Sequence, residues 1–238
     1  MRILAFESSA KAAGTALVHD GLLLGESFLN SGQTHSRTLL SLAEHLLENC
    51  GLSPADIDAC AVAAGPGSFT GIRIGMAAAK GFSWGCQIPL VGVSTLEGMT
   101  RGAAMCDGVY CACMDARRGQ IYNALFRVQG GDMERLCADR AIAVQELEAE
   151  LSQFCGPVFL LGDGAQLTFD LLDGHRDMLR LLPEHLRQQR ASGTALSAWE
   201  ILKAGGLSDA SALAPNYLRM SQAERTRAEN HEFYLKKK

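Results

Sequence analysis

The sequence lacks the cysteine and hydrophobic patterns of secreted, membrane and zinc proteins. Its 8 cysteines are irregularly spaced, and none forms a C-x-x-C pair. This usage is typical of a reducing compartment, and we interpret Cys111 and Cys113 as small core residues. The apolar run after Met1 is too short for a signal peptide, and no run approaches the roughly 18 apolar residues that span a bilayer. We therefore expect a soluble, cytoplasmic protein without membrane contact.

The chain also lacks an excess of positive charge. It has 22 Lys and Arg against 26 Asp and Glu, and the basic residues are scattered along the sequence. This balance argues against an independent nucleic-acid binder, so we expect any RNA contact to come only through a partner. With 238 residues, of which 47% are hydrophobic, the chain can form two modest domains.

Two common phosphate-binding motifs are missing from the most distinctive stretch, Ala63 to Gly75, which reads AAGPGSFTGIRIG. The Walker loop fails because Thr70 or Ile72 stands where its second glycine belongs and no lysine follows. The dinucleotide fingerprint begins at Gly65 and Gly67 but also fails at Thr70.

The same stretch nevertheless predicts a sharp turn between a strand and a helix. Its glycines supply the backbone freedom that a sharp turn needs, and Pro66 fixes its own φ. Such a junction directs backbone N–H groups and a helix N-terminus at one place. A phosphate, a carboxylate or a partner's carbonyl could bind there. We interpret the following residues as nucleotide or phosphate contacts: Glu7, Ser8, Ser9, Gly65, Gly67 and Ser68.

Hydrophobic periodicity predicts an α/β protein with mixed sheets flanked by helices. We expect strands at 3–6, 14–18, 21–25, 59–64, 89–93, 109–114, 120–128 and 158–161, and helices at 34–50, 71–84, 144–154 and 193–204, with short ones after 53 and 94. The pair Asp20-Gly21 predicts a hairpin between the second and third of these strands. A break near 101–108 divides the chain into a first subdomain, 1–104, and a smaller second one, 105–211, and segment 212–230 returns to the first. The charged end at 236–238 is expected to be disordered.

The helix predicted at 71–84 is apolar nearly all the way round, so both of its faces must be covered. One face can pack on a sheet. The other either is enclosed in its own domain or, since Gly75, Ala78 and Ala79 allow close approach, pairs with a helix of another protein.

Five motifs in order resemble those of the TsaB family, also called YeaZ. They are FESS at 6–9, GPGSFTGIRIG at 65–75, DARRG at 115–119, GDG at 162–164 and PNYLR at 215–219. The resemblance implies two subdomains of the actin and sugar-kinase type. It also implies a subunit of the bacterial machinery that makes threonylcarbamoyladenosine beside the anticodon of tRNAs reading codons that begin with A.

The resemblance also shows what this chain lacks. The catalytic paralogue of the family, TsaD, binds a metal through H-x-x-x-H, where this chain has Thr95 and Met99. Neither residue is a good replacement for imidazole. His35 and His45 are ten residues apart, and His175, His185 and His231 lie in polar segments without i, i+4 partners. The resemblance therefore implies a subunit with neither metal nor catalytic residues.

We accordingly expect a scaffold that binds a TsaD-like catalytic subunit and a TsaE-like ATPase, and that forms a homodimer when alone. The expected partner surface comprises Thr34, His35, Leu39, Leu42, Ala43, Leu46, Arg73, Ile74, Ala77, Ala78, Lys80 and Gly81. The subunit itself requires no cofactor, although ATP or ADP could bind at a subunit boundary.

Two alternatives remain open. One is a nucleotide-dependent phosphotransferase that uses the cleft between the subdomains, with Glu7 and Asp115 near a magnesium ion. The other is a metallopeptidase, against which the missing histidine pair argues. The charged turn with Asp115, Arg117 and Arg118 is either a solvated hairpin or a functional loop.

Overall fold

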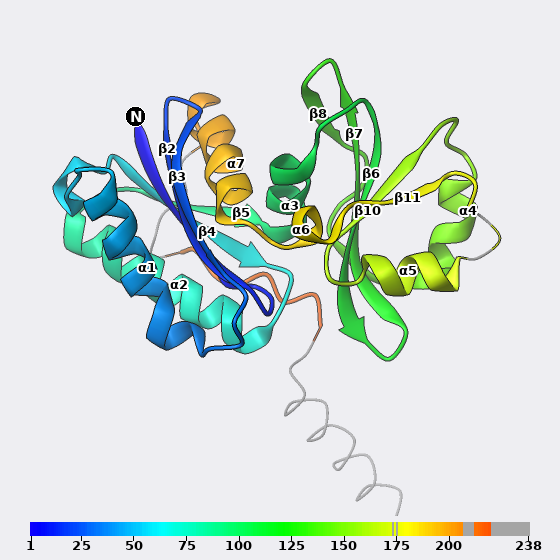
Figure 1. Ribbon diagram of the computed structural model, residues 1–238, viewed down its shortest axis with the longest axis horizontal. Helices are drawn as coiled ribbons and strands as arrows, with labels where there is room; N and C mark the ends of the chain where they lie inside the picture. Colours follow the sequence, from blue (N-terminus) through cyan, green and yellow to red (C-terminus); the bar gives the residue numbers. More distant parts are fainter. Residues whose placement is uncertain (173, 175, 207–211, 220–238) are drawn as a thin grey trace, which may run out of the picture.

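Two sheets, each flanked by helices, form two adjacent subdomains (Figure 1). The computed structural model describes residues 1–172, 174, 176–206 and 212–219. His175, His231 and the end of the chain from 220 lie outside the described residues, as does the part of the predicted returning segment at 220–230. Within the described part, no helix combines the length and apolar character needed to cross a bilayer.

The first sheet has the order β3-β2-β1-β4-β5. Its strands are β1 (Arg2–Glu7), β2 (Ala13–His19), β3 (Leu22–Leu29), β4 (Ala59–Gly65) and β5 (Leu90–Ser94). The first three strands pair antiparallel, whereas β4 and β5 add in parallel. Asp20 and Gly21 adopt positive φ in the turn between β2 and β3, which confirms the predicted hairpin.

The second sheet repeats this arrangement with the order β11-β10-β6-β7-β8, and β9 pairs with β7. Its strands are β6 (Gly108–Arg117), β7 (Gln120–Gln129), β8 (Asp132–Arg135), β9 (Arg140–Ala143), β10 (Val158–Leu161) and β11 (Leu179–Leu181). Again an antiparallel set is extended by two parallel strands. The expected α/β class with mixed sheets is confirmed.

Helices cover both faces of the first sheet. They are α1 (His35–Asn49), α2 (Phe69–Cys86), α3 (Thr95–Ala103) and α7 (Ala191–Lys203), and a 3-10 turn, η1 (Pro54–Asp56), lies before β4. The inner faces of α1 and α2 pack on one side, around Phe6, Leu17 and Val62. Helix α2 begins two residues earlier than predicted because the Ser68 hydroxyl caps it, accepting the N–H of Gly71 at 3.2 Å.

The second subdomain has its own hydrophobic core, in which short helices pack against the second sheet. These are η2 (Val144–Glu146), α4 (Leu147–Leu151), α5 (Ala165–Leu171) and α6 (Glu184–Arg187). Cys111 and Cys113 are buried in this core, as predicted. The predicted helix at 144–154 is shorter than expected, since it consists of η2 and α4 only.

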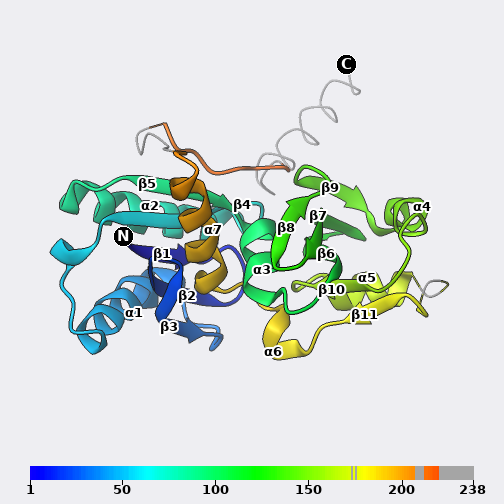
Figure 2. The same ribbon diagram turned by 90° about the horizontal axis from the view of Figure 1, so that it is seen from above.

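Helices α3 and α7 lie between the two sheets (Figure 2). They approach so closely that a Cβ on Gly193 would overlap the backbone of Gly98. We expected 191–203 within the second subdomain, but α7 packs on the first sheet through Ala191, Ala195 and Ala198. Helix α7 fits in the narrow space between the first sheet and α3 because the side chains on its packed faces are small.

Candidate functional site

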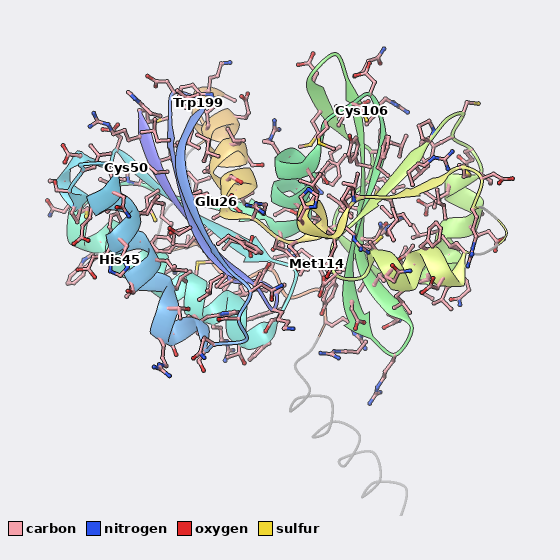
Figure 3. The ribbon with its side chains drawn as sticks, in the orientation of Figure 1. Glu26, His45, Cys50, Cys106, Met114 and Trp199 are labelled. Atoms are coloured by element: carbon pink, nitrogen blue, oxygen red, sulfur yellow. The ribbon has the colours of Figure 1, made fainter. Side chains whose placement is uncertain are left out.

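The sequence motifs converge on one cleft of about 670 Å³ between the subdomains. Its lining comes from distant parts of the chain: Ser9, Ala10, Lys11, Gly67, Ser68, Phe69, Thr70, Met114, Asp115, Ala116, Arg117, Tyr122, Asp163, Asn216, Tyr217, Leu218 and Arg219. Met114 lies at the centre of the molecule, at the end of β6 (Figure 3). A volume of this size suits a ligand as large as a nucleotide.

The wall from the first subdomain is built by close packing of two motifs. The Ser68 N–H donates to the Ser9 carbonyl at 2.6 Å, and the Ser8 hydroxyl donates to the Gly71 carbonyl at 2.9 Å. A Cβ on Gly67, Gly71 or Gly75 would overlap atoms of Ser8 or Ser9. These glycines are therefore required for close approach, and they place the N-terminus of α2 at the cleft.

Glu7 does not reach the cleft. Its side chain is 1% exposed, its Oε1 accepts the Ser9 N–H at 2.7 Å, and its Oε2 accepts the Thr194 hydroxyl at 3.3 Å. Burial raises the pKa of the Glu7 carboxyl, and these hydrogen bonds oppose the shift. Glu7 therefore joins β1 to α7 in the interior of the protein.

The wall from the second subdomain carries opposite charges. The Asp115 carboxylate accepts the backbone N–H of Arg117 at 2.7 Å. Asp163 opens onto the cleft, and its Oδ1 accepts Nε2 of Gln189 at 3.1 Å. The surrounding protein removes water from one side of this carboxyl and so raises the pKa of Asp163.

Residues 212–219 connect the two walls. The Asn216 N–H donates to the carbonyl of Ala64 in β4 at 2.7 Å, while the Arg219 guanidinium donates to the carbonyl of Ala116 in β6. This segment thus returns to the first subdomain, as far as it is described, and then crosses to the second (Figure 1). The return to the first subdomain was expected, but nothing local in the PNYLR motif indicates which strands the segment meets.

The predicted phosphate contacts divide into two groups. Ser9, Gly67 and Ser68 line the cleft. Glu7, Ser8 and Gly65 do not, and the prediction was wrong for them because their atoms are buried in contacts between β1, β4 and α2. Lys11, Tyr122 and Arg219 line the cleft as well. Arg219 belongs to the PNYLR motif, whereas no sequence pattern pointed to Lys11 or Tyr122.

The outer face of α2 is open to solvent. Arg73, Ala77, Gly81 and Trp84 are exposed on it, and the Trp84 side chain is 86% exposed. A Cβ on Gly81 or Gly85 would meet no atom within 4 Å. Sequence periodicity suggested an apolar outer face, but it did not single out Trp84.

The predicted partner residues do not all reach the surface. Thr34, Arg73, Ala77 and Gly81 are exposed. His35, Leu42, Ile74, Ala78 and Lys80 are half-buried. Leu39, Ala43 and Leu46 are at most 6% exposed and pack against the first sheet, so they cannot contact a partner, and the prediction was wrong for them. In place of these residues, α1 exposes Leu40, which is 55% exposed.

The positions aligned with the absent histidines are both inside the protein. Thr95 is fully buried, and Met99 is 3% exposed in the core that joins α3 to the second sheet. Within the described part of the chain, no three His, Cys, Asp or Glu side chains gather in a way that could hold a metal ion.

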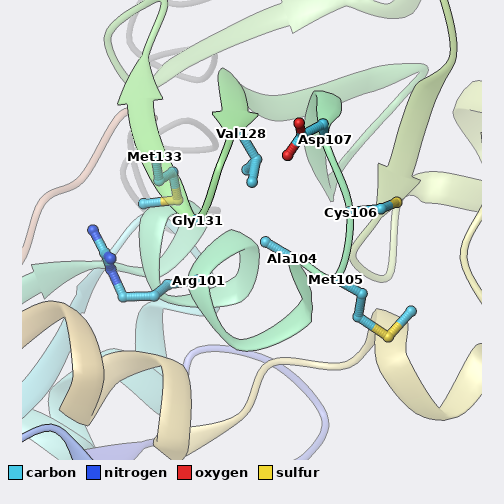
Figure 4. Close-up of a pocket in the computed structure, with 8 residues that line it drawn as sticks. All are labelled: Arg101, Ala104, Met105, Cys106, Asp107, Val128, Gly131 and Met133. Atoms are coloured by element: carbon cyan, nitrogen blue, oxygen red, sulfur yellow. The ribbon is translucent and has the colours of Figure 1, made fainter.

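A second cavity of about 170 Å³ lies between the end of α3 and the β7–β8 hairpin (Figure 4). Met105, Val128 and Met133 line it together with Arg101 and Asp107. It is smaller than the roughly 300 Å³ of an ordinary ligand pocket, and we assign no function to it.

Comparison with known proteins finds the family model of TsaD and curated relatives named TsaB. The family model described as "TsaD: tRNA N6-adenosine threonylcarbamoyltransferase" matches residues 29–226. The tRNA threonylcarbamoyladenosine biosynthesis protein TsaB of Bacillus subtilis is 31% identical over 227 residues, which cover 94% of this chain and 96% of that protein. TsaB of Escherichia coli is 34% identical over 174 residues, covering 72% and 75%.

The fold agrees with a solved structure of the same group. YeaZ from Pseudomonas aeruginosa superposes with a TM-score of 0.75 at 24% identity, covering 91% of this chain and 99% of that one. The expected α/β fold of two subdomains with mixed sheets is therefore shared with that structure.

Proposed function

The chain belongs to the TsaB family, and from that premise we propose that it is a non-catalytic scaffold subunit in the biosynthesis of threonylcarbamoyladenosine in tRNA. The acyl transfer to the adenosine beside the anticodon takes place on a TsaD-like partner, which this chain binds and activates. A TsaE-like ATPase joins the complex. The chain forms a homodimer when the catalytic partner is absent.

The outer face of α2 is the observation that supports this proposal most. Arg73, Ala77, Gly81 and Trp84 follow one another at helical spacing, and all four are exposed. Small residues at two of these positions allow a partner helix to approach closely, and an exposed tryptophan is the kind of residue that dominates binding energy at interfaces. Leu40 on the neighbouring helix α1 is a further exposed apolar side chain.

Burial of the aligned metal positions supports the absence of catalysis in this subunit. Thr95 and Met99 pack in the interior, and neither is among the residues that line the interdomain cleft. A shared fold with a catalytic paralogue does not transfer its chemistry.

The test is binding of the purified chain to its TsaD-like partner, measured by calorimetry. Ala77→Glu places a charge on the outer face of α2, and Trp84→Ala removes the exposed ring. We expect each to weaken binding at least tenfold, because a charge or a truncated anchor at the centre of a helix pair costs about 2 kcal/mol or more. Ala149→Glu, exposed on α4 of the second subdomain, is the matched control.

Binding unchanged by both α2 variants would exclude this face as the interface. A second experiment tests the function itself: omitting the chain from a reconstituted modification reaction must abolish or strongly reduce threonylcarbamoylation of tRNA.

The cleft supports a second candidate, a nucleotide-dependent phosphotransferase. Asp115 and Asp163 lie in it beside the N-terminus of α2, and ATP or ADP would fit its volume. However, Glu7, expected to hold magnesium, is engaged in the interior. ATP turnover by the chain without partners, at an ordinary enzymatic rate, would favour this candidate over the scaffold.

A further inference from the structure

Folding gathers basic residues that the sequence scatters. Lys11, Arg117 and Arg219 line the interdomain cleft, Arg118 follows on the exposed β6–β7 turn, and Arg73 is bound to Tyr217 at the edge of the cleft. They come from four separate segments. Although the overall charge is nearly balanced, these five residues form a basic rim around the opening of the interdomain cleft.

In the described part of the chain, carboxylates do not neutralise these cations, although Arg73 and Arg219 donate hydrogen bonds to Tyr217 and Ala116. Within the described residues, none of the five forms an ion pair with a carboxylate. The cleft itself contributes two acids, Asp115 and Asp163. Among the residues that line the cleft, three cations stand against these two acids, and Arg118 adds a positive charge on the adjacent turn, which favours an anionic partner.

The turn that carries two of the cations has an unusual backbone. Arg117 and Arg118 adopt φ of 68° and 58°, a region in which asparagine or glycine costs less. The charged side chains are therefore kept at a conformational cost, and both are exposed to solvent. A tight hairpin turn itself requires positive φ at its central residues, so this backbone alone fits an ordinary hairpin, and a role is indicated because both charged side chains are exposed beside the cleft.

Aromatic rings lie beside the cations. Tyr217 is 39% exposed and stacks on Phe69 with their centroids 4.7 Å apart, while Tyr122 lines the cleft from β7. Basic residues interleaved with exposed aromatic rings are the usual surface for single-stranded nucleic acid, because phosphates meet the cations and bases stack on the rings.

We propose that this rim, composed of Lys11, Arg117, Arg118 and Arg219 with Tyr217, binds the phosphodiester backbone of tRNA directly. The choice of tRNA as the bound RNA rests on the proposed function, whereas the argument for binding a phosphodiester backbone does not. The inference differs from the expectation that RNA is reached only through a partner, and it assigns the 115–119 motif a role.

The arrangement favours RNA over two other anions. A free nucleotide needs donors that converge on one phosphate, whereas Lys11, Arg117 and Arg118 are exposed around the opening. An acidic protein would need an apolar interface core. Tyr217 is the sole large hydrophobic residue of this rim that is substantially exposed in the described chain.

The test measures binding of labelled, unmodified tRNA by fluorescence anisotropy, with the full-length chain alone and with its TsaD-like partner, between about 50 and 200 mM salt. The variant is Arg117→Ala with Arg118→Ala. We expect affinity to fall on the order of tenfold and the slope of log affinity against log salt to decrease by roughly 1.4 to 1.8, for two lost phosphate contacts.

Two controls separate charge at this site from other effects. Arg117→Lys with Arg118→Lys keeps both charges and should bind tRNA within about twofold of the unmodified chain. Lys203→Ala removes an exposed cation at the end of α7 and should change neither affinity nor slope. Co-elution with the TsaD-like partner is measured on the same samples.

Unchanged tRNA affinity and slope in the Arg117, Arg118 double variant would overturn the inference while leaving the scaffold function intact. Equal losses in the Lys203 variant would overturn it as well, since they indicate non-specific attraction. If the double variant instead loses the partner or ATP while retaining tRNA, the rim binds a protein or a nucleotide, and the inference is again wrong. Failure of the unmodified chain to bind its partner contradicts only the proposed function.

Discussion

Arg73 of α2 and Tyr217 of the crossing segment are 144 residues apart in sequence, and the Arg73 Nε donates to the Tyr217 hydroxyl at 2.8 Å. The guanidinium also lies 3.8 Å from the centroid of the Phe69 ring. This contact joins the outer face of α2, proposed to bind a protein, to the rim of the cleft, proposed to bind RNA. The two surfaces therefore share a boundary at Arg73.

Two substitutions at Tyr217 separate the hydrogen bond from the ring stack. We expect Tyr217→Phe to lower the free energy of unfolding by less than about 1 kcal/mol, because the bond is exposed to water. Tyr217→Ala also loses the stack on Phe69 and should cost about 1 kcal/mol more. Urea denaturation measures both values. Equal effects of the two substitutions would show that the ring contributes nothing to the attachment of residues 212–219.

Two glycines of the central motif are expected to respond to alanine with opposite signs. Gly67 has a φ of 154° and lies against the Ser9 backbone, where a Cβ would overlap, so Gly67→Ala should destabilise the protein by about 1 to 3 kcal/mol. Gly81 lies in α2 with open space around it, so Gly81→Ala should stabilise the protein by about 0.5 to 1 kcal/mol.

Thermal and urea unfolding of the two glycine variants provide the measurement. A stabilised Gly67→Ala protein would mean that β1 and the α2 turn are not packed as described. A destabilised Gly81→Ala protein would mean that the outer face of α2 is covered within the chain itself.

The sequence predicted elements whose signals are local. The Asp20-Gly21 hairpin, the strand at 158–161 and helix α1 were each recognisable from turn residues or periodicity within their own segments. It did not predict that α7 would pack on the first sheet, because a stripe of alanines fits many surfaces and only the tertiary structure selects one.

The cleft was predicted only in part for the same reason. The motif with Gly67 and Ser68 predicted a turn between a strand and a helix, and these two residues do line the cleft. Lys11 and Arg219 are far apart in the sequence, and both line the cleft only because the tertiary structure brings their segments together. No local pattern predicts that arrangement. Leu39 and Trp84 show the limit for helices: both were read as apolar, but only packing decides which one faces solvent.

The buried carboxyl of Glu7 should make the free energy of unfolding depend on pH, and Glu7→Gln should abolish this contribution. Burial raises the pKa of this carboxyl above its ordinary value of 4.5, so the folded protein binds its proton more tightly than the unfolded chain does. As pH rises from about 4.5 through the folded pKa, the folded state must give up that proton, and stability falls by at most about 1.4 kcal/mol per pH unit. Above the folded pKa, the contribution is constant.

Glutamine at this position has no proton to lose, and its amide can accept the Ser9 N–H and donate to the Thr194 hydroxyl. We therefore expect the stability of the wild-type chain, relative to Glu7→Gln, to be highest near pH 4.5 and to decline toward neutral pH. Urea denaturation of both proteins across this range measures the difference. Parallel stability curves would show that Glu7 titrates alike in both states, and its role would then be limited to the hydrogen bonds that join β1 to α7.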